Sequence, residues 1–384
     1  MDVHSFRELP LSSMKRSLAL LSLLSLALTA CAPTTGSGKI KIGFIGPLTG
    51  DAAAYGVDTS HGAQLAVDEI NAAGGINGKM IELIVEDGRC NGADAATAAQ
   101  KLVNVDKVIA IIGGVCSGET LAAAPIAEAG KVVMISPVSS SPDVTTAGDY
   151  IFRDYPSDAL KTTAMAKYFA ENSIKKIATI GENTDFCQAF RTALKEKVPA
   201  GAIVFDEVVE PGTKDFRSLM TRLKDIEFDM FFVNGQSDST DGLMMQQLRE
   251  AGFTQPAIVH DTGDSATLAK TMAEAVEGLY IINVPADVTD PTFEKKFTDK
   301  YGDPQFGLIY VGFAYDGIKV IANGLRAGAS DGTALKDWLY TMPKYSGIVG
   351  SFSFDKNGDV LGIPYVLKQY RKGEIKTLKN IPVD

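Results

Sequence analysis

Histidines, whose side chains titrate near neutral pH, are few in this chain. Three histidines occur among 384 residues, and His4 lies ahead of an apolar N-terminal run. This leaves His61 and His260 for proton transfer near neutral pH, where histidine titrates. No G-x-S-x-G, H-E-x-x-H or C-x-x-C motif is present, so the usual patterns of serine hydrolases, zinc proteases and redox pairs are missing. A triad can be scattered along a chain, and a secreted hydrolase using Ser265 or another serine with His260 stays an alternative, but binding is favoured over catalysis.

The chain also lacks a convincing phosphate or metal motif. The stretch 74–80, GGINGKM, imitates a phosphate loop, but Ala73 stands where the first glycine belongs and Met80 replaces the magnesium-binding hydroxyl. No G-x-G-x-x-G follows the first strand. Glu86 and Asp87 are adjacent at a strand end and point to opposite sides, so they make a poor pair for metal binding or glycoside hydrolysis. We expect no metal, no organic cofactor and no enzymatic activity.

Composition narrows the class of partner. Hydrophobic residues make up 45% and charged residues 22% of the chain, and the formal net charge is −10. Phosphate backbones are held by dense lysine and arginine, so nucleic acid is excluded as a partner. A globular chain of this length is expected to form two domains.

The N-terminus predicts export. Lys15 and Arg16 precede an apolar run from Leu18 to Leu28, which has the length of a signal-peptide core and is too short to span a membrane. The run ends in L-T-A-C at 28–31, which resembles a bacterial lipobox with Cys31 as the lipidated residue; ordinary cleavage at an A-x-A site is the alternative, and Met14 is a second possible start. Residues 1–31 are thus assigned to a signal peptide and 32–38 to a flexible tether.

From Lys39 onward, short β-rich runs alternate with amphipathic helical stretches, the pattern of βαβ units around a parallel sheet. The first cycle is a strand at 40–45 and a helix at 62–72 that ends at Gly74-Gly75. Further strands are predicted at 81–85, 108–112 and 132–135. A second series begins beyond Arg153, with strands at 176–180, 203–208 and 229–233 and helices between them. The tail adds helices at 291–301 and 310–325 and β-like runs at 351–354 and 365–370.

Several spaced strings resemble one known family. They are GFIGPLTG at 43–50, GAQLAVDEINAAGGING at 62–78, VCSG at 115–118, ISPVSSSP at 135–142, GTKDF at 212–216 and AYD at 314–316. Together they are similar to the leucine/isoleucine/valine-binding (branched-chain amino acid) family of type I periplasmic solute-binding proteins of ABC importers. The likeness runs through essentially the whole chain after residue 38.

This resemblance implies an α/β fold of two doubly wound parallel-sheet lobes joined by three crossover segments. We place the crossings near residues 156, 284 and 362. The N-terminal lobe then consists of 39–156 plus 284–362, and the C-terminal lobe of 157–283 plus 363–384.

The resemblance also implies where a ligand carboxylate sits. Ser117 follows a strand and opens a helix, where a hydroxyl and free N–H groups suit an anion. Ser140 matches a second hydroxyl donor, and the backbone of Val138 matches the group that meets the ligand ammonium. Ser139 lies in the same loop and is either a ligand residue or a turn residue.

For the rest of the pocket, the resemblance implies an acid for the ammonium and aromatic walls. Thr262 falls where leucine-binding members carry the acid, so Asp261, or alternatively Asp264, is expected to substitute. The aromatic positions are matched by Tyr55, Phe186 and Tyr310. Gln236 replaces an aromatic, which predicts a ligand with a polar side chain or amide.

Cys90 and Cys116 match the disulfide of the family, leaving Cys187 as either a buried small hydrophobe or a reactive thiol. The implied protein is an exported monomer that closes on an amino acid or related small molecule and hands it to membrane permease subunits. A ligand sensor or receptor-type module for amino acids or small amides is the alternative binding function.

Overall fold

The computed structural model describes Met1 and residues 38–382. All of the predicted signal peptide except Met1, including the lipidation residue Cys31, and all but the last residue of the tether therefore lie outside the described residues. The chain divides into two units, Met1–Gly38 and Lys39–Asp384, and only the second is considered below.

The first sheet contains five parallel strands in the order β2-β1-β3-β4-β5. Its strands are β1 (Ile40–Gly46), β2 (Ile81–Asp87), β3 (Ala110–Gly113), β4 (Val133–Ser136) and β5 (Ile151–Arg153). The central strands β3 and β4 are buried along their whole length. Both faces of this sheet are covered, which explains why these strands are continuous apolar runs without alternation.

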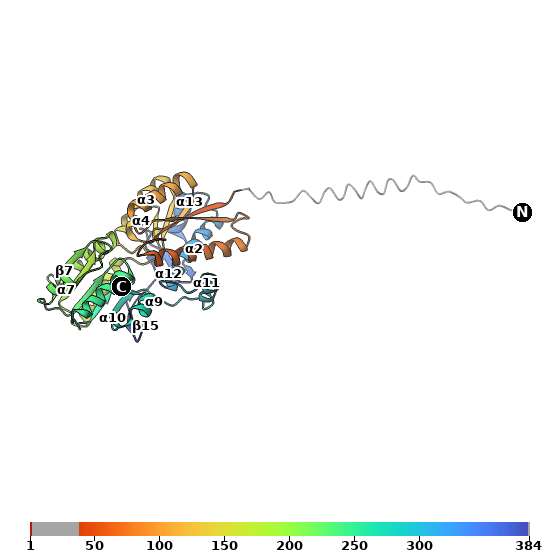
Figure 1. The fold of residues 1–384 in the computed structure, drawn as a ribbon. Coiled ribbons are helices and arrows are strands. Elements are labelled where there is room, and N and C mark those ends of the chain that lie inside the picture. The colour runs from red at the N-terminus through yellow and green to blue at the C-terminus, as the bar shows by residue number, and fades with distance from the viewer. Residues whose placement is uncertain (2–37, 383–384) are drawn as a thin grey trace. The chain divides into compact units, whose positions relative to one another are not determined.

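Helices from two distant parts of the sequence cover this sheet (Figure 1). The early set consists of α2 (Ala53–Ala72), α3 (Gly92–Gln100), η1 (Lys101–Asp106), α4 (Ser117–Gly130) and η2 (Pro142–Thr146). The late set consists of α11 (Phe293–Tyr301), α12 (Leu308–Arg326) and α13 (Gly332–Thr341). Because α12 packs on α2, β3 and β4 and α13 packs on β4, the late segment completes the core of the first sheet.

Helix α2 begins nine residues before the predicted start at Gly62. Glycine lowers helix propensity, and Gly56 and Gly62 both interrupt the pattern. In the fold, each glycine is required by close backbone approach. A Cβ at Gly56 would lie 1.8 Å from the carbonyl oxygen of Pro47, and one at Gly62 would lie 2.3 Å from that of Val311 on α12. The glycines allow α2 to pack closely, and packing outweighs their weak propensity.

The second sheet has seven strands in the order β15-β14-β10-β9-β8-β6-β7. Its strands are β6 (Ile177–Glu182), β7 (Ile203–Val209), β8 (Met230–Asn234), β9 (Ala257–Val259), β10 (Tyr280–Asn283), β14 (Tyr365–Arg371) and β15 (Glu374–Ile381). The helical elements between them are α5 (Asp158–Glu171), α6 (Asp185–Lys197), α7 (Arg217–Leu223), α8 (Asp238–Glu250), η3 (Asp261–Gly263), α9 (Ala266–Thr271) and α10 (Ala273–Val276). The strands β6 to β10 are parallel, whereas β14 and β15 form an antiparallel hairpin at one edge.

Strand β15 was not predicted, and its composition explains why. Its sequence, EIKTLKNI, carries Lys376 and Lys379 on a strand at the edge of the sheet. Charged side chains are common on edge strands because they discourage pairing with other chains. The same charges weaken the β signal in the sequence.

The chain passes between the two sheets after β5, after β10 and before β14. Between the second and third passages lie α11 to α13 and a small sheet of β11 (Tyr345–Gly347), β12 (Gly350–Phe354) and β13 (Val360–Leu361). We call the part built on the first sheet the first lobe and the part built on the second sheet the second lobe. The residue boundaries of the two lobes given above stay a prediction.

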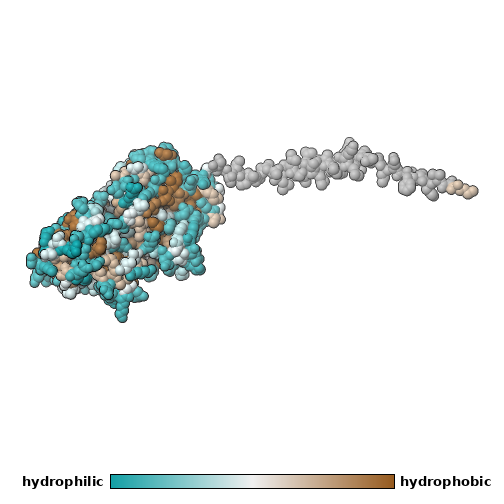
Figure 2. Space-filling model, in the orientation of Figure 1, coloured by the Kyte–Doolittle hydropathy of each residue, from teal (hydrophilic) through white to brown (hydrophobic). Residues whose placement is uncertain are grey.

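The face of the molecule in Figure 2 is mostly hydrophilic. The large apolar side chains that are exposed in residues 38–382, such as Met80, Val105 and Leu361, come from different elements, and single exposed apolar residues are normal for folded proteins. No helix among the described residues is both long and apolar enough to cross a membrane.

Candidate functional site

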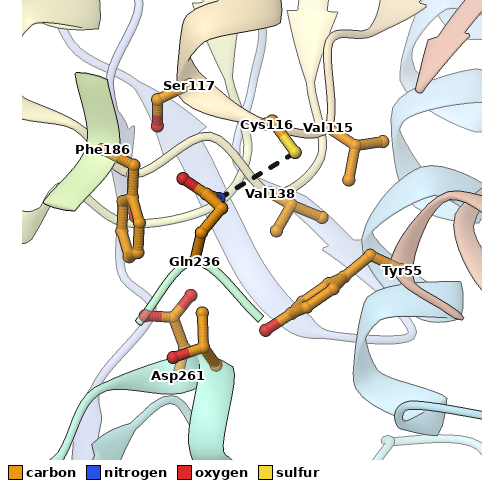
Figure 3. A pocket seen from close by; sticks show the side chains of 10 residues that line it. Tyr55, Val115, Cys116, Ser117, Val138, Phe186, Gln236 and Asp261 are labelled. Carbon is orange, nitrogen blue, oxygen red and sulfur yellow. Dashed lines mark hydrogen bonds between the residues drawn. The ribbon is translucent and has the colours of Figure 1, made fainter. Parts of the chain in front are cut away.

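A small cavity lies where strand ends of the two lobes meet (Figure 3). Its lining residues are Tyr55, Val115, Cys116, Ser117, Val138 and Ser140 from the first lobe, and Phe186, Gln236, Asp261 and Thr262 from the second. The space between them is about 320 Å³ with the mouth included. Ligands of open α/β sheets bind beyond the carboxyl ends of the strands, which is where these loops lie. Because residues of both lobes line this cavity, a ligand that fills it contacts both lobes.

Ser117 supplies a polar group at one end of the cavity. It is the first residue of α4, and its Oγ accepts a hydrogen bond from the backbone N–H of Ser141 at 3.2 Å. The hydroxyl hydrogen is therefore free to be donated to a ligand. First-turn N–H groups of a helix have no intrahelical partner and favour an anion. This end of the cavity suits a carboxylate.

The loop that carries Ser117 is fixed by a disulfide and by a buried carboxyl group. Cys90 and Cys116 are bonded, with Cα atoms 5.3 Å apart, so the predicted disulfide is confirmed. Glu119 accepts hydrogen bonds from the backbone N–H groups of Cys90, Val115 and Cys116 at 2.9, 3.0 and 2.9 Å. Burial raises the pKa of Glu119 to about 7, although these three donors favour its ionised form. Sequence analysis missed Glu119, because its partners lie up to 29 residues away.

The second loop of the first lobe divides its predicted residues between the cavity and the core. Val138 and Ser140 line the cavity. Ser139 does not: its Oγ donates to the carbonyl oxygen of Gly114 at 2.9 Å and lies 2.6 Å from the hydroxyl of Thr120. Ser139 thus ties this loop to the neighbouring one, which is the turn role left open for it.

Ser140 has its hydrogen already engaged. Its Oγ donates to Asp158 Oδ2 at 2.8 Å, which leaves oxygen lone pairs to face the cavity. In this arrangement Ser140 can accept a hydrogen bond from a ligand, whereas the resemblance had implied a donor.

Phe186 and Gln236 form the wall contributed by the second lobe. Phe186 lies in the first turn of α6 and its side chain is buried. The amide of Gln236 projects into the middle of the cavity, with Nε2 4.0 Å from Cys116 Sγ across the gap between the lobes (Figure 3). Sulfur is a weak acceptor, so this amide keeps capacity for a ligand.

The structure separates the two candidate acids for the ammonium. Asp261 lines the cavity, and its Oδ1 contacts Lys161 Nζ. Asp264 does not line the cavity, since its Oδ2 is engaged by Lys368 Nζ at 2.5 Å and by Asn283 Nδ2 at 2.6 Å. Thr262 lines the cavity, but its hydroxyl donates to the buried carboxyl group of Asp241 at 2.6 Å. Asp261 is therefore the available carboxylate of this loop.

Two predicted aromatic residues lie one behind the other. Tyr55 lines the cavity with its hydroxyl directed toward Asp261 (Figure 3), and that hydroxyl has no hydrogen-bond partner among the described residues. Tyr310 lies behind it at a ring-centroid distance of 5.4 Å in an edge-to-face arrangement. The Tyr310 hydroxyl accepts from Asn283 at 2.8 Å and does not line the cavity. Tyr55 can contact a ligand directly, and Tyr310 supports Tyr55.

The pair proposed for a hydrolase is not assembled. The hydroxyl of Ser265 donates to Asp238 Oδ2 at 2.6 Å, and the ring of His260 contacts Asn234 and Thr262. Burial lowers the pKa of His260 to about 3, which makes it a poor base near neutral pH. Cys187 is buried, and burial raises its thiol pKa, so it is a small buried residue with little thiolate.

No group of three or more histidine, cysteine or acidic side chains is arranged for a metal within the described part of the chain. The cavity offers polar groups of opposite character at two ends, hydroxyl and N–H donors near Ser117 and a carboxylate at Asp261, with apolar side chains between them. Such a site can hold a small zwitterion without chemical change.

The sequence was compared with protein families and with individual proteins. Residues 39–374 match the model of a family described as periplasmic binding protein. A leucine-, isoleucine-, valine-, threonine- and alanine-binding protein from Pseudomonas aeruginosa is 30% identical over 351 residues, covering 88% of this chain and 91% of that protein.

The fold was compared with solved structures. A branched-chain amino acid transporter substrate-binding protein from Streptococcus pneumoniae, solved in complex with isoleucine, is 30% identical with a TM-score of 0.79, covering 89% of this chain and all of that one. A leucine-binding protein from Thermotoga maritima is 27% identical with a TM-score of 0.80, covering 89% and 98% of the two chains.

Proposed function

Because the chain belongs to the periplasmic binding protein family, we propose that it binds a free amino acid, or a closely related small molecule, between its two lobes. The observation that carries this proposal is the pairing of Ser117 at the start of α4 with Asp261 on the opposite lobe, one group for an α-carboxylate and one for an α-ammonium. Membership of this family also implies a place outside the cytoplasm.

The side-chain part of the cavity supports a small ligand. Val115, Val138, Tyr55 and Phe186 offer apolar contact, and Gln236 offers one amide. An aliphatic side chain or a short hydroxyl-bearing one satisfies this mixture best. The range of ligands named for the Pseudomonas aeruginosa relative, from leucine to threonine and alanine, agrees with this expectation.

The binding step in this proposal is hinge closure about the three passages between the lobes, with boundaries near residues 156, 284 and 362. The closed monomer would then be recognised by the permease of an ABC importer, and a lipid on Cys31 would hold it at the membrane. Ligand stabilises the closed form because it contacts both walls only when the lobes approach.

Titration calorimetry against the common amino acids and their amides tests the proposal. We expect saturable binding of at least one small aliphatic or hydroxyl amino acid. The complete absence of heat and of thermal stabilisation with every compound would overturn it.

Ser117→Ala gives a sharper test of ligand orientation. A hydrogen bond to a charged group contributes about 1.5 to 3 kcal/mol, so the dissociation constant should rise about tenfold to a hundredfold. Ser265→Ala is the matched control, since it removes an equally buried hydroxyl outside the cavity and should leave the affinity unchanged. Equal affinities of the two variants would show that the carboxylate lies elsewhere.

A further inference from the structure

A fully buried lysine lies directly behind the cavity. Lys161 is on α5, and none of its side chain is exposed. Its Nζ lies 2.8 Å from Asp158 Oδ1 and contacts Asp261 Oδ1. An unpaired ammonium is costly to bury, so these two carboxylates account for its presence.

Asp158 and Asp261 both belong to the second lobe, and each is connected to the cavity by a different contact. Asp158 Oδ2 accepts from the hydroxyl of Ser140 at 2.8 Å, and the backbone N–H of Asp158 donates to the carbonyl oxygen of Ser140 at 2.7 Å. Asp261 lines the cavity itself. A ligand that touches Ser140 and Asp261 therefore touches a hydroxyl bonded to Asp158 and the Asp261 carboxylate, and Lys161 contacts both aspartates.

The charges in this cluster do not balance. Asp158 and Asp261 carry two negative charges when ionised, and Lys161 supplies one positive charge. His260, whose Nδ1 lies 3.8 Å from Asp261 Oδ1, does not supply the second, because burial lowers its pKa to about 3. The cluster is one positive charge short, which is the charge that a ligand ammonium brings.

Burial disfavours the charged forms of the tyrosines packed around the cluster and of Asp241. Burial raises the pKa of Tyr155, Tyr310 and Tyr365 well above the usual value for a phenol. Burial likewise raises the pKa of Asp241, whose carboxyl group contacts Thr262 beside the cavity. None of them supplies a counter-charge for Asp261.

The pKa values of Asp261 and Asp158 are shifted in opposite directions, although Lys161 favours the ionised form of both. Burial is the largest single influence and works to raise the pKa of Asp261, but attraction to Lys161, together with smaller contributions from His260, the Lys161 hydrogen bond and a backbone hydrogen bond, outweighs it, and the net shift is downward. For Asp158 burial dominates, and the net shift is upward. The carboxylate that faces the cavity is thus the more readily ionised of the two.

We propose that Lys161 is a specificity-determining positioning residue that keeps Asp261 ionised and directed into the cavity before a ligand arrives. This inference rests on the proposed function, since it assigns the residue that makes an ammonium group a requirement of the site. All contacts of Lys161 with Asp158 and Asp261 lie within the second lobe, so opening of the lobes leaves them intact. The site is prepared in advance, which lowers the cost of binding.

The consequence of losing Lys161 follows from proton linkage. In Lys161→Met, Asp261 is buried without a counter-ion, its pKa rises and it takes up a proton in the free protein. Binding an ammonium must then release that proton. The affinity should fall with decreasing pH, by up to tenfold per pH unit for one linked proton.

The experiment compares L-leucine with 4-methylpentanoate, which lacks only the amino group, by calorimetry at pH 6, 7 and 8 in buffers of different ionisation enthalpy. Wild-type affinity for L-leucine should be flat across this range with no proton release. Lys161→Met should bind L-leucine at least about tenfold more weakly at pH 6, recover toward pH 8 and release close to one proton. Its affinity for 4-methylpentanoate should not fall.

Lys368→Met is the matched control. Lys368 is also fully buried and paired with an aspartate of the same lobe, Asp264, but neither residue lines the cavity. This variant should lose stability and keep the flat pH profile. A loss in Lys161→Met that is independent of pH, or equal for both ligands, or absent, would overturn the inference and leave Lys161 a structural residue.

A direct titration keeps the inference testable if Lys161→Met does not fold or if wild type binds no amino acid. Carbon-13 NMR of the Asp261 carboxyl group in ligand-free wild type should show it ionised at pH 5. A protonated Asp261 at that pH would overturn the inference. Failure of wild type to bind any amino acid would instead overturn the proposed function.

Discussion

Removal of the Cys90–Cys116 disulfide should destabilise the protein by a predictable amount. The bond closes a loop with a sequence separation of 26. For a loop of this length, the lost chain entropy of the unfolded state corresponds to about 3.5 kcal/mol at 25 °C. With an unfolding entropy of about 2.1 cal/mol/K per residue, this lowers the melting temperature of the unit Lys39–Asp384 by about 5 °C.

The effect on ligand affinity should be much smaller than the effect on stability. Glu119 accepts three backbone N–H bonds from the same loop, so Ser117 stays near its position after the bond is removed. Differential scanning calorimetry of the Cys90→Ala/Cys116→Ala variant, followed by ligand titration, separates the two quantities. Cys187→Ala, which removes a buried thiol outside the bond, is the control and should shift the midpoint less. A double variant that melts within 1 °C of wild type would refute the reasoning.

Three further predictions concern pH, packing and specificity. The pKa of His260 is about 3 in the folded protein, compared with an ordinary value of 6.5. Between these pH values the unfolded chain binds a proton that the folded chain does not, so the free energy of unfolding should fall by about 5 kcal/mol as the pH drops. Urea unfolding of His260→Gln should show a smaller fall with pH, and an identical pH dependence in the variant and wild type would contradict this. Gly62→Ala should lower the free energy of unfolding by about 1 to 3 kcal/mol, because its Cβ would meet the Val311 carbonyl oxygen at 2.3 Å. Helix propensity alone predicts the opposite, a stabilised variant. That result would show that α2 and α12 can separate without cost. Gln236→Leu should raise the affinity for leucine relative to that for threonine by about fivefold, because it replaces an amide by apolar surface. Calorimetry with both amino acids measures the ratio of the two affinities. An unchanged ratio would place the ligand side chain away from Gln236.

Much of the fold followed from local pattern. Strands such as β1 and β4 were predicted because buried strands of a parallel sheet are short apolar runs between helices. The early start of α2 could not be predicted, because Gly56 and Gly62 lower the helix propensity of this segment. What they contribute, close packing of α2 against the backbone of Pro47 and Val311, is visible only in the folded chain. Strand β15 was missed for a similar reason, since its charges suit an edge whose position is set by β14.

The candidate site was predictable in part. Ser117 could be placed because a serine after a strand and before a helix has a defined position at the strand end. Asp261 and Asp264 could not be distinguished in sequence, since both lie in one short loop after β9. Only the contacts of Lys368 with Asp264 and of Lys161 with Asp261 assign one carboxylate to the core and the other to the cavity.

By itself, then, the sequence determined the α/β class, the small number of histidines and the position of Ser117 between a strand and a helix, because each depends on residues close together in the chain. The tertiary structure decided the charge at the other end of the site. Lys161 and Asp261 are separated by 100 positions, and a buried lysine on a helix has no local pattern that names its partner. Electrostatic balance in a buried site is a property of side chains brought together by folding, so it becomes visible only in the folded chain.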